Sequence, residues 1–71
     1  MANNFARPEN VTVLELENLR AELFLDPTPP NEWCIFIYEG RKLLRLTRIS
    51  GSEEFALGVA YGLMLKGTRE Q

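Results

Sequence analysis

Residues 33–49, WCIFIYEGRKLLRLTRI, decide the fold of this chain. The first six, WCIFIY, are aromatic or β-branched apart from one cysteine, and such residues favour strands. Glu39-Gly40 predicts a tight turn, and residues 42–49 continue as a second strand. The stretch therefore predicts a β-hairpin.

The first strand of this hairpin is apolar on both faces. Alternation divides its side chains into two sets, with Trp33, Ile35 and Ile37 on one face and Cys34, Phe36 and Tyr38 on the other. A strand of this kind is typical of the centre of a sheet. We expect a helix on one side of it and, on the other, a second layer formed by the N-terminal segment or by another subunit.

A helix is predicted after the hairpin, at about 52–66. A serine at 50 or 52 can cap its start, and the two glutamates that follow stand where the helix dipole favours negative charge. Gly67 stands where a helix commonly stops.

Two patterns compete before the hairpin. Thr12 and Glu15 have the spacing of a helical capping box, yet polar and apolar residues also alternate over parts of 11–25, as in strands. The segment 11–18 is therefore either a short helix or a strand. The prolines of DPTPPN, at 26–31, predict a loop.

These elements predict a single small α+β domain. Its expected parts are a three-stranded antiparallel sheet at about 20–26, 33–38 and 42–49, a C-terminal helix at about 52–66, a domain spanning 11–67, a flexible arm at 1–10 and a tail at 68–71.

Composition limits what can stabilise such a domain. The chain has 71 residues, one cysteine and no histidine. At this size the core alone gives little net stability, and disulfides, a structural metal or oligomerisation are the usual aids. An intrachain disulfide needs two cysteines, and zinc sites need sets of thiolates and imidazoles. We expect no metal or cofactor, and a homodimer.

Catalysis is not expected. Without histidine, neither a Ser/His/Asp nor a Cys/His system can be assembled. Cys34 lies inside the aromatic-rich strand, which favours a buried, inert thiol. The glycines match neither a Walker-type nor a dinucleotide-type spacing.

The first residues, MANNFARPEN, do not have the pattern of a signal peptide. No apolar run approaches the roughly 20 residues that span a bilayer. With a single cysteine as well, these features predict a cytoplasmic protein that does not act at a membrane.

The predicted helix is apolar nearly all round, since residues 55–65 contain no charge and Tyr61 alone carries a polar side-chain atom. Because a small sheet covers only one side of a helix, an uncovered apolar face predicts an interface. The expected interface residues are Leu57, Gly58, Tyr61, Gly62, Met64 and Leu65, together with Trp33. Gly58 and Gly62 admit a second explanation, which is close packing of the helix on its own sheet.

The favoured function is protein binding. An apolar helix, an acidic first half and aromatic residues that anchor interfaces well predict a homodimeric adaptor, inhibitor or accessory regulator, such as one of a phage or bacterial system.

Nucleic-acid binding is the alternative. The basic residues Arg41, Lys42, Arg45 and Arg48 cluster in the hairpin, although a net charge of −2 and a pI near 5.0 disfavour nucleic acid as the main ligand. These charges can also simply pair with acidic residues on other strands.

The stretch EWCIFIYEGRKLLRLTRISGSEEFALGVAYG has the order strand, glycine turn, basic strand, helix. Over about 33–66 it distantly resembles the arm-binding domains of phage integrases and the plant ethylene-response DNA-binding domain. The resemblance implies a sheet that enters the DNA major groove, with Arg41, Arg45 and Arg48 as groove or phosphate contacts.

Overall fold

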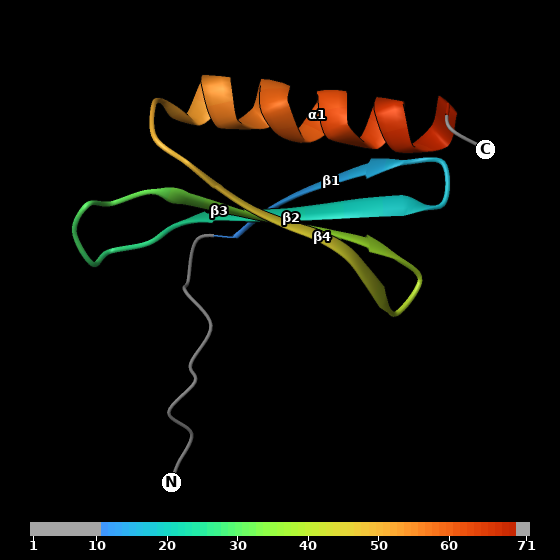
Figure 1. The fold of residues 1–71 in the computed structure, drawn as a ribbon, viewed down its shortest axis with the longest axis horizontal. Helices are drawn as coiled ribbons and strands as arrows, with labels where there is room; N and C mark the ends of the chain where they lie inside the picture. Colours follow the sequence, from blue (N-terminus) through green and yellow to red (C-terminus); the bar gives the residue numbers. More distant parts are fainter. Residues whose placement is uncertain (1–10, 70–71) are drawn as a thin grey trace, which may run out of the picture.

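The computed structural model describes residues 11–69, so the predicted arm at 1–10 and the last two residues of the predicted tail lie outside it. The elements are β1 (Thr12–Leu16), β2 (Leu19–Leu25), β3 (Trp33–Glu39), β4 (Lys42–Ile49) and α1 (Glu53–Arg69). The strands form one antiparallel sheet in the order β1-β2-β3-β4. Helix α1 lies across one face of this sheet (Figure 1).

The α+β fold, with an antiparallel sheet against a C-terminal helix, is confirmed. The predicted strand count is wrong, because the sheet has four strands rather than three. The segment left open as helix or strand forms β1, which pairs with β2 from Thr12 opposite Leu23 to Leu16 opposite Leu19. Alternation explains this outcome, since every second residue of β1 faces the helix side and the others face away.

Two-residue turns join β1 to β2 and β3 to β4, whereas a longer loop, 26–32, joins β2 to β3. Glu17 has a φ of 58° in the β1–β2 turn, and Gly40 has a φ of 63° in the β3–β4 turn. Glycine adopts positive φ without a steric penalty, so the Glu39-Gly40 signal correctly marked a turn. Glu17 adopts the same region with a side chain, which explains why the sequence gives no comparable signal for the first hairpin.

The core lies between α1 and the sheet. Ala56, Ala60 and Met64 follow one another at intervals of four residues and are fully buried. The sheet contributes the other buried members of this cluster, Leu19, Ala21, Leu23, Ile35 and Ile37. Alanine on both sides lets the helix approach the strands closely.

The helix begins as the sequence predicts and ends later. The hydroxyl of Ser52 accepts a hydrogen bond from the backbone N–H of Phe55 at 3.1 Å, which makes Ser52 the N-cap. Gly67 was expected to stop the helix, but α1 continues to Arg69. Gly67 lacks the positive φ of a helix stop, and a Cβ built on it would lie 3.8 Å from Leu19 Cδ1, so this turn still packs on β2.

Candidate interaction surfaces

The aromatic side chains of residues 11–69 are not buried in the core. Aromatic residues usually dominate a core because each can bury 150–250 Å². None of the aromatic residues within 11–69 belongs to the buried class. They are Phe24, Trp33, Phe36, Tyr38, Phe55 and Tyr61. Trp33 packs against the edge of the core, and the other five rings are exposed or half-buried on the surfaces of the described chain.

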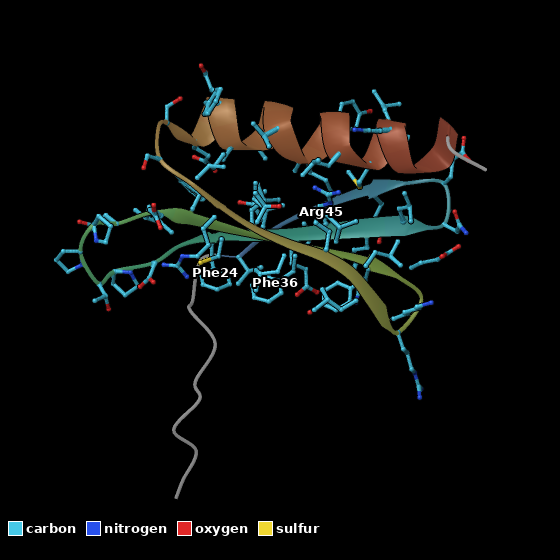
Figure 2. All side chains as sticks on the ribbon, in the orientation of Figure 1. Phe24, Phe36 and Arg45 are labelled. Atoms are coloured by element: carbon cyan, nitrogen blue, oxygen red, sulfur yellow. The ribbon has the colours of Figure 1, made fainter. Side chains whose placement is uncertain are left out.

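Three of these rings form a row on the sheet face that points away from α1, which we call the outer face. Phe24 and Phe36 have ring centroids 5.8 Å apart and planes inclined by 18°. Phe36 and Tyr38 follow at 6.4 Å and 10°. The Arg20 guanidinium carbon lies 5.3 Å from the Tyr38 ring centroid, which is cation–π geometry. Figure 2 shows Phe24 and Phe36 on the side of the sheet opposite the helix.

Leucines on the edge strand β4 extend this apolar surface. Leu46 pairs with Phe36 and Leu43 pairs with Tyr38, so both stand on the outer face. A register shift between Ile37 and Tyr38 leaves Leu44 as an additional residue in β4. All three leucines are exposed, Leu46 by 53%. Antiparallel sheets with one solvated face normally carry polar residues there, so an apolar outer face indicates a second layer.

Arg48 and two carboxylates form a charged cluster at one corner of the outer face. The Arg48 guanidinium lies 2.7 Å from Asp26 Oδ2 and 3.2 Å from Glu32 Oε1. It also donates to Cys34 Sγ at 3.2 Å. The hydrogen bond from Arg48, followed by that from the Thr28 backbone N–H, lowers the pKa of Asp26, and the two carboxylates raise the pKa of Arg48.

Cys34 lies beneath this corner, and its buried position is as predicted. Burial raises the pKa of its thiol, against the opposing effect of the nearby Arg48 charge. A raised pKa keeps the sulfur protonated, and the thiolate is the nucleophilic form. The arrangement therefore favours packing over reactivity at Cys34.

A second apolar surface runs along the side of α1 that faces away from the sheet, which we call the outer helix face. Its exposed residues are Phe55, Gly58, Tyr61, Gly62 and Leu65. A Cβ built on Gly58 or Gly62 would meet nothing within 4 Å. Close packing of these glycines on their own sheet, the alternative explanation of their spacing, is therefore wrong.

The other expected interface residues lie elsewhere. Met64 is fully buried against the sheet and is unavailable to a second chain, so its assignment to an interface needs correction. Leu57 is half-buried beside the core. Trp33 is half-buried too, and its indole N–H donates to the Gly51 carbonyl at 3.2 Å, next to the start of the helix.

The basic residues of the hairpin do not share one surface. Arg41 belongs to the β3–β4 turn, and Lys42 pairs with Glu39 at the start of β4. Arg45 pairs with Ile37 and rises on the helix side of the sheet (Figure 2), whereas Arg48 pairs with Cys34 on the outer face. Arg48 does pair with acidic residues, but its partners Asp26 and Glu32 lie in the β2–β3 loop rather than on another strand, as the sequence had predicted.

Sequence reasoning missed the outer face as a candidate site. The two-sided apolar pattern of 33–38 did predict a second layer, which was the available signal. The exposed leucines of β4 gave no clear signal, because in the sequence they are interspersed with the basic residues of the same strand. Within 11–69, no group of three or more cysteine and acidic residues is arranged to hold a metal ion, and no helix there is long and apolar enough to cross a membrane.

Comparisons with protein-family models, with curated proteins and with solved structures find no match for this chain. The physical features of the two apolar surfaces are thus what bears on function.

Proposed function

We propose that this chain is a small non-catalytic interaction module that binds a partner protein and works as a homodimer. An adaptor, an inhibitor and an accessory regulator are the activities that suit such a module. One observation carries the proposal, which is that five of the six aromatic residues of 11–69 lie on the molecule's two outward faces, while the sixth, Trp33, packs against the core without being buried in it.

The outer helix face is suited to partner binding. It presents Phe55, Tyr61 and Leu65, each about half exposed, around the two glycines. Tyrosine is enriched among the residues that carry most of the energy of protein interfaces. Two glycines at exposed positions each weaken a helix by about 1 kcal/mol relative to alanine, so their presence is explained by a partner that needs close approach to the backbone.

A matched pair of variants tests this assignment. Leu65→Glu places a charge at the centre of the outer helix face, and Arg45→Glu places one on an exposed β4 residue outside both apolar surfaces. Proteins that co-purify with the tagged wild-type chain in fixed stoichiometry are expected to be lost with Leu65→Glu and kept with Arg45→Glu. Circular dichroism checks that both variants are folded. Retention of every such protein by a folded Leu65→Glu variant contradicts the proposal.

A further inference from the structure

We propose that the outer face of the sheet is the homodimer interface, in which a second copy of this chain packs face to face with its strands aligned. This inference deepens the proposed function and rests on its homodimer, and it leaves the outer helix face free for the partner. Three features of the outer face favour a second copy as its occupant, namely its apolar centre, its area and its charges.

The centre of the outer face is apolar and its border is charged. The centre consists of Phe24, Phe36, Tyr38, Leu43 and Leu46. The border consists of Glu15, Arg20 and Glu22 on the β1–β2 side and Asp26, Glu32 and Arg48 at the opposite corner. An apolar centre with a polar rim is the usual anatomy of a protein interface.

The area of the face suits a small dimer. Four strands about 4.8 Å apart and about seven residues long, at about 3.4 Å per residue, have a projected area of roughly 450 Å². The side chains that stand on the sheet make the solvent-accessible area of the face larger than this projected area. The smallest stable interfaces bury about 600 Å² on each partner, so a dimer needs the whole face. A helix or peptide would cover only part of it.

The charges in the loops of the sheet are distributed unevenly between its two ends. At one end, the β2–β3 loop, which we call the acidic loop, carries Asp26 and Glu32 against Arg48 of β4. At the other end, the β3–β4 turn, which we call the basic turn, carries Arg41 and Lys42 against Glu39. The two ends lie at opposite extremes of the sheet (Figure 1).

A two-fold axis across the strands brings unlike ends together. Such an axis lies in the interface plane and places the basic turn of each copy over the acidic loop of the other. The contact is made twice, because an isologous interface repeats each interaction. The opposite arrangement, with like ends together, would bring two acidic loops into proximity.

The register of the sheet supports one position for this axis, at the level of Ile37. With the axis there, each outer-face residue on one side of that level faces a residue of the second copy that lies equally far on the other side. Phe36 faces Tyr38 of the second copy, and Leu46 faces Leu43 of the second copy. Glu22 faces Arg20 of the second copy, which matches charge as well as apolar area. Aligned packing of two sheets about 10 Å apart gives a sandwich with a helix on each outer side.

Light scattering coupled to size-exclusion chromatography tests the interface directly. The wild-type chain is expected at twice 8.1 kDa. Leu46→Glu, at the centre of the outer face, is expected to give a monomer with an unchanged circular dichroism spectrum. Leu65→Glu, the matched variant on the outer helix face, is expected to remain a dimer. A wild-type monomer, or a dimer lost with Leu65→Glu and kept with a folded Leu46→Glu, overturns the interface.

Charge reversal tests the orientation without touching the apolar centre. The double variant Arg41→Glu/Lys42→Glu reverses the basic turn, and Glu32→Lys reverses a residue of the acidic loop. Each alone is expected to raise the dimer dissociation constant roughly tenfold, because two-fold symmetry doubles a contact that is individually weak. An equimolar mixture of the two variants is expected to restore the wild-type constant, since unlike ends then meet at both contacts. A mixture no tighter than the separate variants overturns the proposed axis.

The two proposals fail in different ways. A monomeric wild-type chain that still loses its partner with Leu65→Glu would remove the dimer and leave partner binding in place. A dimer that follows the expected pattern, with no partner affected by Leu65→Glu, would leave the interface and remove the outer helix face as the binding surface.

Discussion

Arg48 and Asp26 tie the edge strand to the loop that leaves β2, with Arg48 Nη2 2.7 Å from Asp26 Oδ2. The same loop is closed by its own backbone, since the Asp26 N–H donates to the Glu32 carbonyl at 2.9 Å. The Thr28 N–H donates to the Asp26 carboxylate, also at 2.9 Å. Asp26 is therefore the residue on which the acidic loop depends.

The loop is expected to loosen in acid. The pKa of Asp26 in the folded chain lies below its ordinary value of 3.8, mainly because of the hydrogen bond from Arg48. A carboxylate of this kind stabilises the fold fully above the ordinary pKa, and its contribution is lost as the pH falls through the lowered value. Amide hydrogen exchange in 26–32 is expected to accelerate below about pH 4 relative to the intrinsic rates. Asp26→Asn should remove this pH dependence, and an identical dependence in that variant contradicts the assignment.

Met64 and Leu65 are neighbours in sequence with opposite surroundings. Met64 is fully buried and Leu65 is exposed. Met64→Ala is expected to lower the free energy of unfolding by about 2–5 kcal/mol, the usual cost of truncating a large core side chain. Leu65→Ala is expected to change it by about 0.5 kcal/mol or less. Urea unfolding of both variants at a concentration where the protein is monomeric makes the comparison, and similar losses would show that the helix is rotated relative to the sheet.

The local elements could be predicted from sequence wherever one strong pattern occurred. The hairpin of β3 and β4 combined β-rich strands with a glycine turn, and the helix start combined Ser52 with two glutamates. The first hairpin could not be predicted as firmly, because Glu17 occupies a turn position that usually signals itself by glycine or asparagine. The side chains of β1 also satisfied a helical period over a few residues.

The candidate site was only partly predictable. The apolar sequence of the helix does indicate that one of its faces is not covered by the sheet. Because apolar residues occur all round the helix, periodicity does not show which face this is, and the prediction placed Met64 on the uncovered face although it is buried. The outer face depends on contacts between different strands, such as the stacking of the Phe24 ring on the Phe36 ring. The register shift that sets how Leu43 and Leu44 stand in β4 also becomes visible only in the paired sheet.

The two hairpin turns offer opposite substitutions. Glu17→Gly is expected to raise the free energy of unfolding by about 0.5–1 kcal/mol, because glycine removes the cost of a side chain at positive φ but loses more entropy on folding. Gly40→Ala is expected to lower it by about 1–2 kcal/mol through the backbone alone, since its Cβ would meet no atom within 4 Å. Thermal unfolding measures both, and a destabilised Glu17→Gly variant contradicts the account of this turn.

Nucleic-acid binding through the hairpin is expected to be weak. Arg48 is held by two carboxylates, and Arg45 stands on the other face of the sheet. A duplex titrated with the protein should show little binding at physiological salt, and a shallow dependence of affinity on salt, because few phosphates are neutralised. Tight binding with a steep salt dependence that Arg45→Glu abolishes would instead favour the nucleic-acid alternative. Lys66→Glu, which makes the same charge change at an exposed residue of α1, serves as the control.

Substitutions at Gly58 and Gly62 are expected to change the stability of the chain and its partner binding in opposite directions. Each glycine is exposed on the outer helix face and has room for a Cβ. Alanine at either position is expected to raise the free energy of unfolding by about 1 kcal/mol, because glycine is a poor helix former. The same methyl group would stand between the helix and a partner's backbone, so binding of the partner should weaken while the protein becomes more stable. Thermal unfolding and a binding titration on the same samples test both effects, and partner affinity that is unchanged in the Gly58→Ala/Gly62→Ala variant would show that no backbone approaches this face closely.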